Sequence, residues 1–377
     1  MTRLALIFPS YYPALQFGGP AIASKTFFMT LSKSLKISMV TTDAGLSTDD
    51  VQLAQNDGLV IPIIKFRPLD RLGILTSGYA HLYTIIKNND YIYLRGIWCY
   101  ISVIALIFSI YLKKPIIVAS TGKIPALSRL DYSKLTLKTY FKILFVKILL
   151  KHSKYVHFTS MDEFVASQIF LEKYSISVKP LILPTAIPFD MSTFCFDNKC
   201  VESKKLNFLI LSRLDPIKNI DKSLKLFFSL LKEYPGSKLN VVGHFSSEAY
   251  KMECLNIIEE AQMVEAVHFH GQLERNLVFQ VLRDSQIFIQ MSDTEGFSNS
   301  ILEAQAAGLF LIVSQGCNYM PPEKHGMVLK DTDTLKDLVT EINQRQTKAL
   351  ISKQAYDTFG MEALTNHYSA VVAGLDH

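Results

Sequence analysis

The sequence predicts an α/β protein of two domains, each a doubly wound parallel sheet with helices on both faces. Strand-like apolar runs alternate with helix-like segments along nearly the whole chain, which is the pattern of such sheets. Many of these runs are apolar without a break, as expected for strands that are buried on both faces. The chain has 377 residues, whereas a single hydrophobic core rarely grows beyond about 250–300 residues. These three observations predict two domains in series.

The first domain is expected to span residues 1–189. Its expected strands are residues 3–8, 36–42, 59–65, 91–94, 115–119, 155–158 and 180–183, and its two clearest helices are residues 21–35 and 97–112. The second helix carries no charge, but it is shorter than the roughly 20 residues that a bilayer needs and it contains polar side chains. A buried core helix is therefore expected there rather than a membrane span. The apolar run at the N-terminus ends at Pro9 and is too short for a signal peptide.

A polar segment without periodicity, residues 190–205, marks the expected boundary of a second domain that spans residues 190–360. Its expected strands are residues 207–211, 238–242, 267–270, 287–291 and 309–313, and its expected helices are residues 221–233, 246–262, 273–284 and a short one that starts near 299. The closing stretch, residues 355–375, is expected to be helical.

Charge is divided unevenly between the two halves. Residues 1–190 carry 21 Lys and Arg against 11 Asp and Glu, a net +10, and the remainder carries 18 against 23, a net −5. A basic half indicates an anionic partner such as phosphates or anionic lipids. Nucleic acid is not expected as a partner, because the basic residues do not form a known recognition motif. The five cysteines are scattered and lack zinc-ligand spacing, so neither a disulfide framework nor a zinc site is expected.

Residues 293–308, DTEGFSNSILEAQAAG, form the strongest candidate site. They lie between two apolar strands, and Ser298 or Asn299 can cap a short helix that Gly308 ends. The loop with Glu295 therefore opens onto free backbone N–H groups at a helix N-terminus. That arrangement suits an anionic ligand such as a diphosphate.

Two further loops follow the first strand of each domain. Residues 17–20, FGGP, would let the backbone approach a phosphate, although a simple tight turn would use the same residues. Residues 211–219, LSRLDPIKN, place Arg213 and Lys218 at the carboxyl end of a strand, where two cations can neutralise a diphosphate. A solvated loop would also use such residues.

Residues 132–155 combine apolar residues with regularly spaced lysines, namely Lys134, Lys138, Lys142, Lys147, Lys151 and Lys154. A helix of this composition suits an anionic membrane surface. The alternative is a solvated face on an ordinary packed helix.

Together these segments resemble the retaining, nucleotide-sugar-dependent glycosyltransferases of glycosyltransferase family 4, which have the GT-B fold: two Rossmann-like domains that face each other across a cleft. The resemblance covers nearly the whole chain and is strongest in residues 211–218, in 241–243 (VVG) and in the paired-glutamate motif that runs from Glu295 to Glu303. Weaker family patterns are matched by residues 17–20, 156–160 (VHFTS) and 182–184 (ILP). The resemblance also implies that the end of the closing stretch, from about 361 to 377, packs back on the first domain.

The resemblance implies a site for a nucleotide-sugar donor. Glu295 would face the donor sugar, while Arg213 and Lys218 would hold the diphosphate and stabilise its charge as it leaves. The other donor contacts that the resemblance implies are Gly18, Gly19, Gly296, Phe297, Ser298, Asn299 and, at the ribose hydroxyls, Glu303. No cofactor and no metal are expected, since the two cations and the helix N-terminus neutralise the diphosphate. The acceptor hydroxyl is expected to attack the front face of the sugar, with the leaving phosphate taking its proton.

On the acceptor side the chain departs from the family pattern. Residues 119–123 are ASTGK where many members have His or Arg, so Thr121 and Lys123 are the acceptor-side candidates, and the usual Asn-Gly after the last strand of the first domain is here Thr185-Ala186. The resemblance implies transfer of a hexosyl or N-acetylhexosaminyl group to a saccharide or lipid-linked oligosaccharide acceptor in bacterial O-antigen (lipopolysaccharide) or capsule synthesis. Such an enzyme is expected in the cytoplasm, as a peripheral protein at the inner face of the plasma membrane.

Two other functions fit parts of the pattern. A glycoside hydrolase also uses two carboxylates, but it needs them about 5–9.5 Å apart, whereas eight residues of helix would separate Glu295 from Glu303 by about 12 Å. An inactive glycosyltransferase-like scaffold or binding protein is the remaining alternative. The presence of Arg213, Lys218 and Glu295 argues against it.

Overall fold

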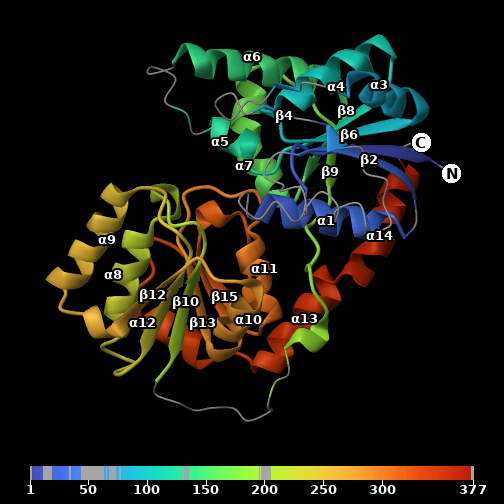
Figure 1. The fold of residues 1–377 in the computed structure, drawn as a ribbon. Coiled ribbons are helices and arrows are strands. Elements are labelled where there is room, and N and C mark those ends of the chain that lie inside the picture. The colour runs from blue at the N-terminus through green and yellow to red at the C-terminus, as the bar shows by residue number, and fades with distance from the viewer. Residues whose placement is uncertain are drawn as a thin grey trace. The chain divides into compact units, whose positions relative to one another are not determined.

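The computed structural model describes residues 2–11, 19–33, 35–43, 63–64, 66–67, 74–75, 78–128, 130, 136–194, 196 and 205–374. The chain divides into two compact units (Figure 1). The first contains Met1–Pro188 and Met361–His377, and the second is Phe189–Gly360. Each unit holds one parallel sheet with helices on both faces, which confirms the predicted fold class.

The first unit is built on a seven-stranded parallel sheet in the order β3-β2-β1-β6-β7-β8-β9. Its strands are β1 (Arg3–Ile7), β2 (Lys36–Thr42), β3 (Ile63–Ile64), β6 (Tyr91–Arg95), β7 (Ile116–Ala119), β8 (Ser153–Phe158) and β9 (Pro180–Ile182). A separate antiparallel pair joins β4 (Phe66–Arg67) to β5 (Ile74–Leu75). Strands β1, β6 and β7 are mainly apolar because both of their faces are buried, whereas β8 is buried only in its second half.

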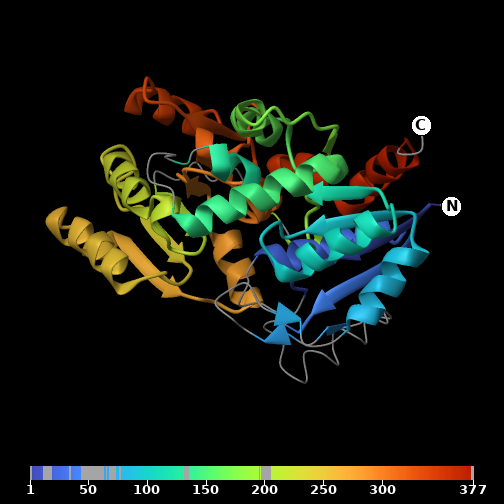
Figure 2. The same ribbon diagram turned by 90° about the horizontal axis from the view of Figure 1, so that it is seen from above.

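Helices cover both faces of this sheet. One face packs against α3 (Tyr79–Asn88), α4 (Tyr100–Tyr111), α5 (Lys123–Ser128), α6 (Leu137–His152) and α7 (Met161–Lys173). In Figure 2, α6 is the long green helix near the centre of the picture. The other face packs against α1 (Gly19–Leu31) and α14 (Met361–Ala373). The last helix of the chain therefore completes the core of the first unit.

Tyr368 fixes α14 in that core. Its side chain is 1% exposed, its ring lies 5.5 Å from that of Phe27, and its hydroxyl donates to the carbonyl of Pro184. The stretch 355–375 is not one helix, as predicted, but two. The first, α13 (Lys348–Phe359), ends at Gly360, which has extended backbone and separates it from α14.

The second unit is built on a six-stranded parallel sheet in the order β12-β11-β10-β13-β14-β15. Its strands are β10 (Asn207–Leu211), β11 (Lys238–Val242), β12 (Val267–Gly271), β13 (Ile287–Gln290), β14 (Phe310–Ser314) and β15 (Gly326–Leu329). One face is covered by α8 (Ile220–Leu230), α9 (Glu248–Glu260) and α12 (Leu335–Asn343), and the other by α10 (Arg275–Asp284), α11 (Asn299–Ala306) and α13. The described residues of this unit also form short 3₁₀ turns, namely η3 (Met191–Thr193), η4 (Pro216–Lys218), η5 (Val264–Ala266) and η6 (Gln315–Cys317).

Most predicted elements lie within a few residues of the observed ones, with identifiable exceptions. The predicted strand 59–65 falls largely outside the described residues, which include only β3 from it. The elements that were not predicted from the sequence include α3, α5 and α7 in the first unit and β15 and α12 in the second. Strand β15 gave little signal, because it is a four-residue edge strand that begins with a glycine.

The uncharged helix α4 is only partly a core helix. Ile101 and Ala105 are buried, but Ile107, Ile110 and Tyr111 are exposed. Among the described residues, no helix combines the length and apolar character needed to cross a bilayer.

Candidate donor site

The loops after β10 and β13 meet at one point of the second sheet. Strand β10 pairs with β11 on one side and with β13 on the other, so the strand order reverses between β10 and β13. In open parallel sheets, ligands bind at the carboxyl ends of the strands at such a reversal. The loop 212–219 and the loop 291–298 both lie there.

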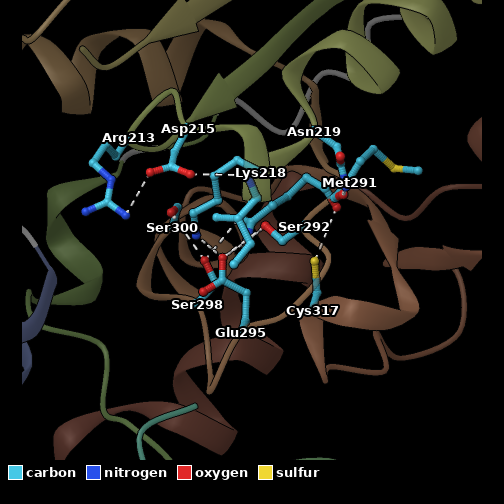
Figure 3. A network of polar contacts seen from close by, with 12 residues as sticks. Arg213, Asp215, Lys218, Asn219, Met291, Ser292, Glu295, Ser298, Ser300 and Cys317 are labelled. Atoms are coloured by element: carbon cyan, nitrogen blue, oxygen red, sulfur yellow. Dashed lines mark hydrogen bonds and ion pairs between the residues drawn. The ribbon is translucent and has the colours of Figure 1, made fainter. Parts of the chain in front are cut away.

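The central contact is an ion pair between Lys218 Nζ and Glu295 Oε1 (Figure 3). Both side chains are mostly buried, at 17% and 16% exposed. The same carboxylate oxygen accepts from Gln290 Nε2 at 2.9 Å and from Ser292 Oγ at 3.0 Å. Because three donors converge on Oε1, the direction of the Glu295 carboxylate is fixed before any ligand binds.

The turn that carries Lys218 is tied to the Glu295 loop. Asp215 caps η4 by accepting from Ile217 N at 3.2 Å. Asn219 has left-handed backbone with a φ of 48°, and its Nδ2 donates to Met291 O at 2.8 Å and to Asp293 Oδ1 at 2.6 Å. Asn219 therefore locks the two loops together, and asparagine is one of the few residues that tolerate this conformation.

Arg213 lies on the same loop with a more open environment. Its side chain is 57% exposed, and its guanidinium is 3.3 Å from Asp215 Oδ2. Gly243, after β11, supports the loop from behind, because its φ is 141° and a Cβ there would overlap the carbonyl oxygen of Ser212. The guanidinium is thus accessible to an anion while its backbone is tightly packed.

The backbone of Glu295 is anchored by the turn after β14. Glu295 N donates to Gly316 O at 2.8 Å, and Asn318 Nδ2 donates to Glu295 O. A Cβ at Gly316 would overlap the carbonyl oxygens of Ser292 and Asp293. Only glycine allows these two loops to lie so close together.

The N-terminus of α11 lacks the side-chain cap that was predicted for Ser298 or Asn299. Ser298 occupies the N-cap position, but its Oγ donates to Gln290 Oε1 at 3.0 Å and makes no side-chain cap. Asn299 is the first helical residue. The Ser298 side chain therefore does not cap this helix, and the orientation of a helix N-terminus favours an anion.

Gly296 and Phe297 complete the predicted loop. The ring of Phe297 lies 5.2 Å from that of Tyr319 and 5.7 Å from that of Phe359. Phe297 therefore packs into an aromatic cluster and contributes its backbone, rather than its side chain, to the loop surface.

Glu303 lies on α11, two turns beyond the loop. Its side chain is only 7% exposed, and its Oε1 is 2.9 Å from the guanidinium of Arg275. The two glutamates of the paired motif thus have different partners, a lysine for Glu295 and an arginine for Glu303.

The remaining predicted residues belong to the first unit. Gly18 lies outside the described residues, and Gly19 is the first residue of α1. Thr121 has a φ of 45° in the turn after β7, and Lys123 begins α5. That turn is held by the fully buried Glu163, whose Oε1 accepts from Gly122 N at 2.6 Å.

Several residues around the site were not identified from the sequence. They are the supporting donors Gln290, Ser292, Asn219 and Asn318, and the cation Arg275. Gln290 could have been recognised from the sequence as a site residue, since it is a polar residue at the end of a buried apolar strand. No sequence feature pointed to Arg275, because an arginine at a helix N-terminus is normally solvated. Within the described part of the chain, no three His, Cys, Asp or Glu side chains are grouped as metal ligands.

Residues 196–357 match the model of the protein family described as Glycosyl transferases group 1. The match lies within the second unit and covers most of it, including the loops that carry Lys218 and Glu295. No curated protein sequence matches the chain.

The chain is also similar to solved structures. It superimposes on HepE from Anabaena in complex with UDP and glucose with a TM-score of 0.70, at 14% identity over 99% of this chain and 100% of that one. For sucrose-phosphate synthase from Thermosynechococcus elongatus the TM-score is 0.70, at 14% identity over 100% and 99% of the two chains. For WaaG, a glycosyltransferase involved in lipopolysaccharide biosynthesis, it is 0.58, at 15% identity over 98% and 100%. At these identities the likeness establishes the fold, which is GT-B with two Rossmann-like domains.

Proposed function

We propose that this chain is a retaining glycosyltransferase that uses a nucleoside diphosphate sugar as donor. The observation that carries the proposal is the Lys218–Glu295 ion pair at the strand-order reversal of the second sheet. It lies beside the exposed guanidinium of Arg213 and within the segment that matches glycosyl transferases group 1. Structures of proteins with this fold hold UDP and UDP-glucose, which supports a nucleotide sugar as ligand.

The proposed roles follow from the charges in the site. Arg213 and Lys218 hold the two phosphates and stabilise the charge that develops as the diphosphate leaves. The N-terminus of α11 adds further positive potential. Glu295, whose carboxylate is fixed by three donors, faces the donor sugar. The acceptor hydroxyl attacks from the side of the departing phosphate, which takes the proton.

We further propose that no metal ion takes part, because two cations and a helix N-terminus already neutralise a diphosphate. Transfer should then be unchanged in excess EDTA. A loss of transfer that Mg²⁺ or Mn²⁺ restores would contradict this part of the proposal.

The proposed product is a saccharide of a bacterial surface polysaccharide, extended on a lipid-linked acceptor by a hexosyl or N-acetylhexosaminyl group. One of the proteins with this fold, WaaG, acts in lipopolysaccharide biosynthesis, which supports this setting. Thr121 and Lys123 are the proposed acceptor-side residues.

A peripheral position at the inner face of the plasma membrane fits the surface of α6. Five of its apolar side chains are exposed: Leu137, Tyr140, Phe141, Leu144 and Ile148. Its lysines are less available than the sequence predicted, because Lys142 lies over Trp98 and Lys147 over Tyr174. Lys134 falls outside the described residues. We therefore propose that this apolar row, with Lys151 at its end, enters the headgroup region of an anionic membrane.

The test is transfer of radiolabelled sugar from a panel of UDP- and GDP-sugars to lipid-linked saccharides, with donor hydrolysis measured in parallel. Transfer with retention of the anomeric configuration supports the proposal. If the folded protein shows neither transfer nor hydrolysis with any of these donors, the scaffold alternative is the better explanation.

A further inference from the structure

Glu303 is a nearly buried carboxylate whose two oxygens have different surroundings. Its Oε1 pairs with Arg275 at 2.9 Å. Within the described part of the chain, its Oε2 has no hydrogen-bond partner. This oxygen is not one of the fully buried unpaired side-chain atoms, so it still reaches solvent and is open to a hydrogen-bond donor from a ligand.

Arg275 is held more firmly than an ordinary surface arginine. It is the first residue of α10, and its guanidinium carbon lies 4.6 Å from the ring centroid of Phe279 and 5.4 Å from that of Phe189. The two rings contact each other with centroids 5.1 Å apart. A planar guanidinium against two aromatic rings has one preferred orientation, and cation–π attraction stabilises it.

We propose that Arg275 is a positioning residue that holds Glu303 Oε1 and so presents Oε2 to the ribose hydroxyls of the donor nucleotide. This inference rests on the proposed function and adds a residue to its donor site. The arrangement is a chain of contacts within the second unit: two phenylalanines orient Arg275, Arg275 orients Glu303, and Glu303 accepts from the ribose.

This arrangement should affect the affinity only for nucleotides that carry the ribose hydroxyls. A hydrogen bond from a hydroxyl to a charged acceptor changes affinity by about 10-fold or more. A nucleotide that lacks the ribose hydroxyls should lose this factor with the wild-type protein. When Arg275 no longer directs the carboxylate, the same protein should bind both nucleotides almost equally.

The experiment measures dissociation constants by calorimetry for UDP and GDP, each compared with its 2′,3′-dideoxy form. For the nucleotide that binds, the wild-type ratio of dideoxy to ribose form should be about 10 or more. Arg275→Met should reduce this ratio to near 1, chiefly by weakening the ribose form, and Glu303→Gln should do the same. Arg275→Lys, which keeps the charge but not the planar geometry, should retain part of the ratio.

Arg283→Met provides the matched control, since Arg283 lies on the same helix and is exposed in its last turn. It should leave the ratio unchanged. If Arg275→Met fails to fold, Arg275→Lys carries the test, because it keeps the charge but not the planar geometry. Its ratio should lie between that of the wild type and 1, and an unchanged ratio in the folded variant would contradict the inference.

Three results would overturn the inference, and they are distinguishable. A wild-type ratio preserved in folded Arg275→Met and Arg275→Lys would make the ion pair purely structural. A wild-type protein that binds a nucleotide without preference for the ribose form would remove Glu303 from the site while leaving the proposed function intact. Binding of neither UDP nor GDP by the wild type would contradict the proposed function itself.

Discussion

Lys218 and Glu295 form an ion pair although 77 positions separate them in the sequence. The pairing joins the loop after β10 to the loop after β13, where the strand order of the second sheet reverses. A lysine with a carboxylate partner is held in place, so the site is ordered in the absence of a phosphate. A diphosphate that binds there meets a cation whose position is already defined.

Removing either member of this pair should lower transfer strongly with little effect on folding. We expect Lys218→Ala and Glu295→Ala each to reduce kcat/KM by about 100-fold or more, as for other groups that stabilise a leaving charge. In Lys218→Ala the carboxylate keeps Gln290 and Ser292 as donors, so the loop should stay intact. Initial rates and thermal unfolding check both expectations.

Lys222→Ala is the matched control for these variants. Lys222 lies on the next turn of chain, 3.7 Å from Asp293, with a side chain that is 58% exposed. Its replacement should change kcat/KM by less than about 2-fold, since exposed ion pairs contribute little. Normal turnover in a folded Lys218→Ala variant would refute the assignment of the donor site.

The first unit should lose stability in mild acid because of His157. Its Nε2 donates to Leu183 O at 2.7 Å, which leaves Nδ1 to accept from the hydroxyl of Tyr93 at 2.6 Å. Burial lowers the pKa of His157 from its ordinary value of 6.5 to about 4. Between these values the unfolded chain binds the proton and the folded chain does not, so stability falls as the pH drops from 6.5 towards 4. The loss should reach up to about 3 kcal/mol.

The measurement is urea unfolding of the wild type and of His157→Gln at several values between pH 4 and pH 7. The variant cannot take up the proton, so its stability should depend less on pH in this window, even if it is less stable throughout. An identical pH profile for both proteins would show that other groups cause the acid sensitivity.

Glu163 should be essential for the turn that carries Thr121. It is fully buried, and its carboxylate accepts from Gly122 N at 2.6 Å and from the backbone and hydroxyl of Thr159, both at 2.7 Å. Glu163→Gln replaces one acceptor oxygen by an NH₂ group that faces these donors. We expect a loss of about 1–3 kcal/mol in the free energy of unfolding.

The control for that change is Glu172→Gln. Glu172 lies on the same helix, α7, but is exposed, so the substitution should leave the melting temperature nearly unchanged. Equal stability of Glu163→Gln and the wild type would mean that the turn does not depend on the carboxylate.

The apolar row on α6 should govern attachment to membranes. We expect the wild type to sediment with vesicles that contain phosphatidylglycerol, and to do so less as salt rises, because part of the attraction is electrostatic. Replacing Phe141 and Leu144 by serine should reduce the bound fraction several-fold, since each loses apolar area that would enter the interface. Val264→Ser, at a similarly exposed apolar position in the second unit, should bind like the wild type. Equal binding of all three proteins would exclude α6 as the attachment surface.

The second unit shows most clearly which features the sequence alone could predict. Most of its strands and helices were predicted to within a few residues, because apolar periodicity is a local property that windows of about 5–18 residues reveal. The exceptions are β15, α12 and the start of α13. The residue types at the carboxyl ends of β10 and β13 were also sufficient to identify Arg213, Lys218 and Glu295 as candidates, because parallel sheets bring those ends together. The sequence by itself therefore determined the fold class and these three charged candidates, but not Arg275.

Which groups pair with which was decided only by the tertiary structure. No local pattern links Arg275 to Glu303, Asn219 to Met291 or Glu163 to Gly122, since each pair is joined by packing between elements distant in the chain. Tertiary packing also decided the environment of the α6 lysines. Their spacing predicts a basic face, but Lys142 and Lys147 lie over aromatic rings of the same unit. Periodicity shows which residues share one side of a helix. The direction in which that side faces depends on the neighbours that cover it.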